Sequence, residues 1–96
     1  MVSFAEVKNR RDEILTIAHK YGVHNIRVFG SVVRGEESQD SDLDLLVTMD
    51  KGRSLLDRIG FMQDIGDLLH IKVDVVNEKA LHKLIRESVL KEGVEI

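Results

Sequence analysis

The chain alternates between hydrophobic patterns of helical period and short runs typical of strands. From Phe4 to Tyr21 the apolar residues recur at an approximately helical spacing, and Gly22 suits the position just after a helix. Ser3 and Glu6 form an S-x-x-E capping box ahead of this stripe. The pattern predicts a first helix that begins near Phe4 and ends before Gly22.

Three segments rich in β-branched and aliphatic residues predict strands. They are residues 26–29, 43–49 and 71–76. The second is apolar almost throughout, which indicates burial on both faces. Ser54 and Asp57 could cap a helix between the second and third strands, although Gly60 and Gly66 each disfavour it by about 1 kcal/mol relative to Ala.

The end of the chain predicts one more helix and a short edge strand. Asn77 could cap that helix, Gly93 would end it, and residues 94–96 would form the strand. No linker, repeat or low-complexity segment interrupts the pattern. We therefore expect a single domain over residues 1–96 with an α/β (α+β) fold, in which helices pack on a small mixed sheet.

The composition excludes several classes of function. The chain has 96 residues, no Cys and a net charge of −3. Without Cys there are no disulfides, thiol chemistry or Cys-based zinc sites. The absence of a basic surplus argues against nonspecific nucleic-acid binding. No apolar run is long enough to cross a bilayer, and the N-terminal residues have no apolar signal core, so we expect a cytoplasmic protein.

Two carboxylates stand at the start of the second predicted strand. Asp42 and Asp44 are two residues apart, so in a strand they would point to the same face. Like charges that close repel, and a divalent cation would remove the repulsion. Mg²⁺ prefers carboxylates together with substrate phosphate oxygens. The pair therefore suggests chemistry on a nucleoside triphosphate.

Gly30 and Ser31 follow the first predicted strand and could cradle the phosphates. Gly allows close backbone approach, and Ser31 would begin a helical turn whose free N–H groups attract anions. Alternatively, Ser31 is a simple cap of a strand-to-helix turn. Arg34 could reach a phosphate from the same side of that turn, or it could be a solvated cation in the loop.

Asp74 lies in the middle of the third predicted strand, between two Val residues. An acid in such a run is costly unless it is paired or bound to a metal. If the second and third strands are neighbours, Asp74 could meet Asp42 and Asp44, and three carboxylates match a two-metal site for phosphoryl transfer. One Mg²⁺ would clamp the triphosphate and the other would activate an acceptor hydroxyl, with Asp74 as ligand or base. Pairing of Asp74 with Lys72 or an Arg is the alternative.

Taken together, Gly30-Ser31, Asp42-x-Asp44 and Asp74 resemble the signature of the minimal nucleotidyltransferase family within the DNA polymerase β-like superfamily. The resemblance covers most of the chain, from about residue 4 to the end. It implies a polymerase β-like nucleotidyltransferase core, with Asp42, Asp44 and Asp74 as catalytic and metal-binding residues. It also implies that Gly30, Ser31 and Arg34 bind the nucleotide.

Members of that family are typically antitoxins encoded beside a HEPN-domain ribonuclease toxin. The resemblance implies a nucleotidyltransferase that moves AMP from ATP, with Mg²⁺, onto a tyrosine of the toxin. The alternative is an antitoxin that inhibits the toxin by contact alone. An antibiotic nucleotidyltransferase is disfavoured because nothing in the sequence suggests a domain for the acceptor. We expect no direct contact with nucleic acid or membrane.

Overall fold

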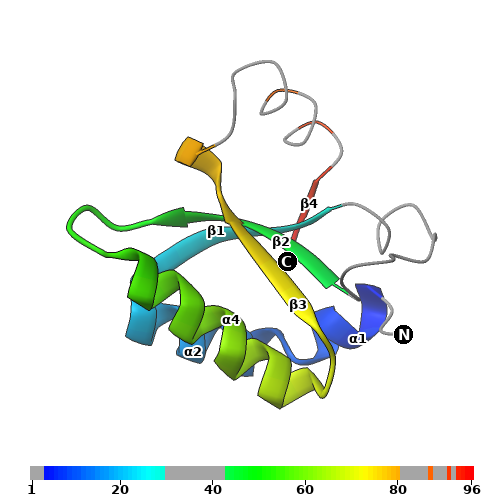
Figure 1. Cartoon of the computed structure of the whole chain (residues 1–96). Helices are drawn as coiled ribbons and strands as arrows, with labels where there is room; N and C mark the ends of the chain where they lie inside the picture. The colour runs from blue at the N-terminus through cyan, green and yellow to red at the C-terminus, as the bar shows by residue number, and fades with distance from the viewer. Residues whose placement is uncertain (1–3, 30–42, 81–86, 88–90, 92) are drawn as a thin grey trace.

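The computed structural model describes residues 4–29, 43–80, 87, 91 and 93–96. The described chain combines helices and strands in one α/β fold, as the sequence predicts (Figure 1). The elements are α1 (Phe4–Asn9), α2 (Arg11–Tyr21), β1 (Val23–Phe29), β2 (Leu43–Met49), α4 (Leu55–Leu69), β3 (Val73–Asn77), the 3₁₀ helix η1 (Glu78–Ala80) and β4 (Val94–Glu95).

The four strands form a mixed sheet in the order β3-β2-β1-β4. β1 runs antiparallel to both β2 and β4, whereas β2 and β3 are parallel. Parallel neighbours need a crossover connection, and α4 supplies it. The predicted small mixed sheet is therefore confirmed, with β3 and β4 at its two edges.

α2 and α4 lie on one side of the sheet, where they cover the main core (Figure 1). Every second residue of β2, starting with Leu43, faces these helices. Large side chains with no exposed surface on this face come from both layers: Ile14, Val28, Leu45, Val47, Phe61, Ile65 and Val75. Full burial of one such side chain contributes about 1.5–3 kcal/mol. This face therefore supplies most of the apolar stabilisation and fixes the sheet in place.

β1 begins three residues before the predicted strand. Its pairing with β2 shifts by one residue between His24 and Arg27, so β1 carries a β-bulge with one extra residue. Asn25 adopts a left-handed backbone conformation within the bulge, with φ of 52°. This part of the strand was not predicted, because it contains polar residues and its backbone is not extended throughout.

The predicted single first helix is wrong in one respect, because it breaks at Arg10 into α1 and α2. The Arg10 backbone leaves the helical region, with φ −101° and ψ 16°, and its side chain bonds Glu13 in the first turn of α2. Val7 and Ile14 are both fully buried across the break. The apolar stripe therefore continues without a visible interruption. Gly22 caps α2 in the left-handed conformation, with φ of 69°.

α4 begins as predicted at Ser54 and Asp57. The Ser54 backbone N–H donates to the Asp57 carboxylate at 2.9 Å, and this bond holds the pKa of Asp57 below its usual value. The helix continues through Gly60 because the glycine faces the ring of Tyr21. A Cβ at Gly60 would lie 2.6 Å from a ring carbon of Tyr21, so the missing side chain lets α2 and α4 approach closely.

The predicted last helix lies almost entirely outside the described residues. At its start, the side chain of Asn77 accepts a hydrogen bond from the backbone N–H of Lys79, but this cap begins the short helix η1. The predicted edge strand is present as β4. In the part of the chain that the structure describes, no helix is long and apolar enough to cross a membrane.

Candidate active site

Asp44 of β2 and Asp74 of β3 stand directly opposite each other in the parallel pair. Neighbouring strands are about 4.8 Å apart, so two carboxylates in register are close neighbours. Asp44 is half-buried and Asp74 is exposed. The second and third predicted strands are thus adjacent, which is the arrangement that a shared site for these two acids requires.

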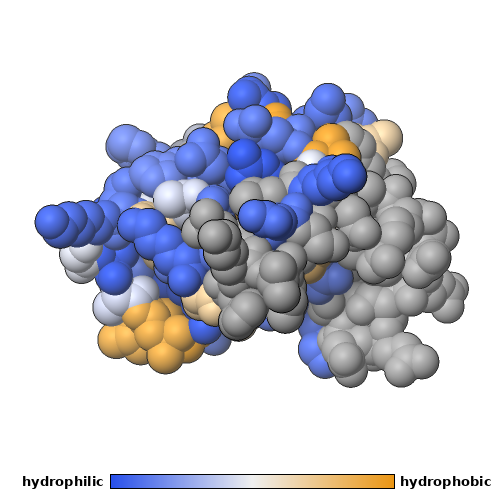
Figure 2. Space-filling model, turned by 90° about the horizontal axis from the view of Figure 1, so that it is seen from above, coloured by the Kyte–Doolittle hydropathy of each residue, from blue (hydrophilic) through white to orange (hydrophobic). Residues whose placement is uncertain are grey.

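Both carboxylates lie on the face of the sheet opposite α2 and α4. Side chains alternate between the faces of a strand, and the neighbours Leu43, Leu45, Val73 and Val75 belong to the core beneath the helices. Figure 2 views the molecule from above this opposite side, and most of the described surface there is hydrophilic. Consecutive residues of each strand therefore belong alternately to the core face and to the carboxylate face.

The other predicted site residues can be placed only along the chain. Phe29, the last residue of β1, pairs with Asp44, and Gly30 and Ser31 follow it directly. Asp42 comes just before β2. Gly30, Ser31, Arg34 and Asp42 themselves lie outside the described residues.

A second polar group on the carboxylate face was not identified from the sequence. Thr48 of β2 donates to the Glu78 carboxylate at 3.1 Å, and Arg27 of β1 lies 3.9 Å from the same oxygen. The side chains of Arg27 and Glu78 are 28% and 23% exposed. Arg27 is the one Arg, Lys, Asp or Glu in β1, but Glu78 lies far away in sequence and no local signal connects the two residues. This group ties η1, directly after β3, to the two central strands.

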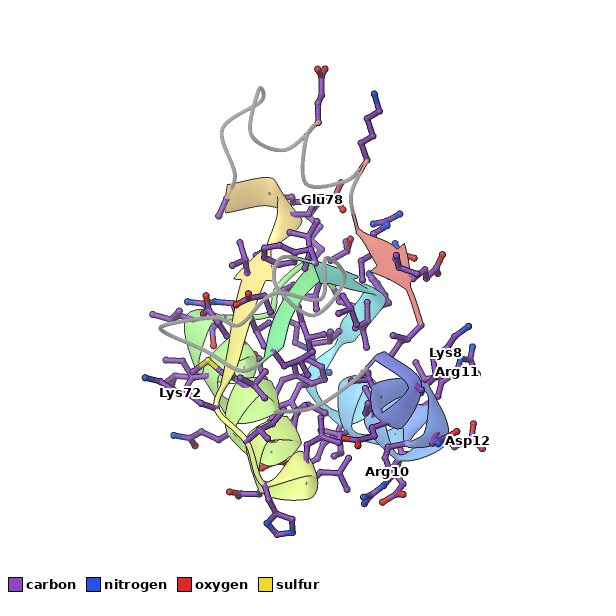
Figure 3. The ribbon with its side chains drawn as sticks, turned by 90° about the vertical axis from the view of Figure 1, so that its right-hand side faces the viewer. Lys8, Arg10, Arg11, Asp12, Lys72 and Glu78 are labelled. Carbon is purple, nitrogen blue, oxygen red and sulfur yellow. The ribbon has the colours of Figure 1, made fainter. Side chains whose placement is uncertain are left out.

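The beginning of β3 is fixed by its main chain. The carbonyl of Lys72 accepts a hydrogen bond from the N–H of Leu43 at 3.3 Å, which joins the starts of β2 and β3. Figure 3 shows Lys72 and Glu78 at the two ends of β3, with Asp74 between them in the sequence. Both ends of the strand that carries Asp74 are therefore attached to β2.

The two carboxylates suit a hard divalent cation. Carboxylate oxygens are the donors that Mg²⁺ prefers, and the accessible side of Asp74 leaves room for a substrate oxygen and water. Asp44 and Asp74 supply two such groups. Within the residues that the structure describes, no group of three His, Asp or Glu side chains is gathered as a metal site. Asp42 is the candidate for the third ligand.

A mixed sheet with helices on one face and two opposed carboxylates on the other is an arrangement suited to metal-assisted chemistry on phosphates. Residues 11–96 match the family model described as a nucleotidyltransferase domain. The chain belongs to this family and is a nucleotidyltransferase of the minimal kind.

The relatives agree on that class. The protein adenylyltransferase MntA of Thermococcus cleftensis is 42% identical over 91 residues, which cover 88% of this chain and 91% of that protein. A solved structure provisionally named a minimal nucleotidyltransferase is 40% identical, with a TM-score of 0.85 over 99% of this chain and 97% of the other. The chain also shares its fold with a complex of an MNT antitoxin and the tri-AMPylated HEPN toxin of Shewanella oneidensis, at 18% identity, a TM-score of 0.68 and coverages of 92% and 69%.

Proposed function

We propose that this nucleotidyltransferase transfers AMP from ATP, with Mg²⁺, to a tyrosine of a partner HEPN-type ribonuclease toxin, and so acts as an antitoxin. The register that sets Asp44 opposite Asp74 on the face away from the helices carries the proposal. The relative MntA, 42% identical, is named a protein adenylyltransferase, which supports a protein as the acceptor.

Each residue of the predicted set has a role in this proposal. Asp42, Asp44 and Asp74 hold Mg²⁺, which when bound neutralises charge on the triphosphate and lowers the pKa of the acceptor hydroxyl. Gly30 and Ser31 bind the phosphates through backbone N–H groups. Arg34 adds a positive charge beside them.

The transfer breaks a phosphoanhydride bond of ATP and forms a phosphoester bond to the tyrosine. The phenolic oxygen of the tyrosine forms a bond to the α-phosphorus of ATP, the bond from that phosphorus to the bridging oxygen breaks, and pyrophosphate leaves. The phenolic proton passes to Asp74 or to solvent. Positioning and charge stabilisation supply most of the catalysis in such transfers. We propose no direct contact with nucleic acid, no membrane association and a cytoplasmic location.

The decisive experiment is the intact mass of the purified toxin after incubation with this protein, ATP and Mg²⁺. We expect one or more AMP adducts on the toxin, mapped to tyrosine, and silencing of the ribonuclease by substoichiometric amounts of this protein. The variant with both Asp42→Asn and Asp44→Asn should add no AMP. If that variant silences the toxin as well as wild type at every molar ratio, inhibition by contact alone is correct and the transferase proposal fails.

A further inference from the structure

Among the residues that the structure describes, the strand that carries Asp74 has a neighbouring strand on one side only. β3 is an edge of the sheet, whereas β2, with Asp44, lies between two strands. Like charges directly opposite each other on neighbouring strands are destabilising. Repulsion between Asp44 and Asp74 therefore acts to push the edge strand away from the sheet. A contact on the outer side of β3 would oppose this repulsion in addition to the pairing with β2.

Arg58 of α4 makes such a contact. Its guanidinium Nη1 donates to the backbone carbonyl of Val75 at 2.6 Å. The carbonyl of Lys72 points toward β2, because it accepts from Leu43. Backbone groups alternate in direction along a strand, so the carbonyl of Val75 points to the outer edge. Arg58 thus bonds β3 on the side opposite β2, one residue after Asp74.

The helix that carries Arg58 is firmly attached to the sheet. Phe61 and Ile65 of α4 are completely buried in the core beneath β2 and β3. A hydrogen bond from a charged donor is stronger than a neutral one. No described carboxylate forms an ion pair with Arg58, in contrast to Arg53, which pairs with Asp57 at 3.3 Å. The edge of β3 is the polar partner of the Arg58 side chain in the described part of the chain.

We infer that Arg58 is a positioning residue: it clamps the outer edge of β3 through Val75 and holds Asp74 in register with Asp44 against their mutual repulsion. The inference rests on the proposed function, because the register matters only if the two carboxylates share a cation. Loss of a partner that orients a metal ligand typically costs 10–100-fold in metal affinity.

The test measures Mn²⁺ binding by electron paramagnetic resonance in the full chain and follows hydrogen exchange of the β3 amides. Arg58→Met removes the donors and keeps a long apolar side chain, Arg58→Lys keeps a cation that can reach a carbonyl, and Arg53→Met is the matched control. We expect Arg58→Met to raise the Mn²⁺ dissociation constant by about 10–100-fold and to speed exchange in β3. Arg58→Lys should recover most of the affinity, and Arg53→Met should match wild type. Equal Mn²⁺ affinity and equal exchange in Arg58→Met and wild type would overturn the clamp.

A second measurement separates the clamp from a purely structural role. Asp74→Asn removes the repulsion, so Arg58→Met should lower the melting temperature less in the Asp74→Asn background than in wild type. An equal loss in both backgrounds contradicts the inference. If Arg58→Met alone does not fold, we expect the double variant Arg58→Met/Asp74→Asn to fold, because the repulsion is gone. A double variant that also fails to fold would contradict the inference. Failure of the wild type itself to bind Mn²⁺ counts instead against the proposed metal site.

Discussion

The side of the sheet that faces α2 and α4 is apolar along β1, β2 and β3, whereas the opposite side places a charged residue on each of these strands. Arg27, Asp44 and Asp74 are those residues, and their sequence neighbours Val28, Leu45 and Val75 are completely buried on the other side. The same strands thus supply the main core with the side chains that face the helices and carry the charged side chains on the other side, where Leu46 is also completely buried. Substitutions one residue apart should therefore have different consequences.

Asp74→Asn should give the largest effect and should leave the fold intact. The substitution removes a charge from an exposed position and keeps the shape of the side chain, so we expect transfer to fall by about 10²–10⁴-fold, the range for loss of a catalytic base. The free energy of unfolding should be unchanged or slightly raised, because repulsion with Asp44 is relieved. Single-turnover rates and urea melts measure the two quantities. A large loss of stability would show that the Asp74 side chain stabilises the fold, as the side chains of the core face do.

Phe61→Ala tests the apolar side. Phe61 is completely buried beneath the sheet, and truncation of such a residue costs about 3–5 kcal/mol of unfolding free energy. We expect a lower urea midpoint, with transfer by the folded fraction close to that of wild type. The specific activity at low temperature, corrected for the folded fraction measured by circular dichroism, checks this. A folded but inactive variant would mean that the two faces are coupled.

Gly60→Ala sharpens the comparison within the helix layer. Helix propensity alone favours Ala by about 1 kcal/mol, but the new Cβ would lie 2.6 Å from the Tyr21 ring, and overpacking costs about 1–3 kcal/mol. We expect a net loss of stability in wild type. In a Tyr21→Ala background the same substitution should be stabilising. Thermal melts of the four proteins give the coupling, and a stabilising effect in both backgrounds would refute the contact.

The smallest effect concerns pH and the start of α4. The Ser54 N–H holds the folded pKa of Asp57 below the unfolded value of about 3.9, so the stability that Asp57 contributes is present above that value and is lost as the pH falls through the folded pKa. The difference in melting temperature between wild type and Asp57→Asn should therefore be largest near neutral pH and shrink below about pH 4. A constant difference down to pH 3 would exclude this assignment.

Much of the fold was predictable because the strands of the core carry strong local patterns. β2 matched its prediction at both ends, since it is apolar at most of its positions and is bounded by polar residues. The break at Arg10 was not predictable, because the apolar stripe on either side of it keeps the same spacing. Gly60 weakened the prediction of α4, and only the position of Tyr21 explains why a glycine suits a helix there.

For the site, the sequence indicated the candidate residues but not which of them lie close together in the fold. The possible meeting of Asp44 with Asp74 depended on the order of strands, which local pattern does not determine. The contacts of Arg27 with Glu78 and of Arg58 with Val75 join residues 51 and 17 positions apart. Nothing in the local sequence of either arginine distinguishes it from a solvated cation.

The bulge in β1 has a consequence for how the chain length can vary. Its extra residue changes the phase of the strand, so that Arg27 and Phe29 share the face of Asp44 while Val23 and Val28 both face the helices. Deletion of Asn25 would remove the bulge and leave a regular strand, in which Val23, Ile26 and Val28 still face the helices and the pairs with β2 are kept. Single insertions and deletions within residues 27–29, where the pairing is regular, would exchange the two faces and should be excluded there. They should be accepted in the exposed turn at residues 50–53, where a change of length alters no pairing.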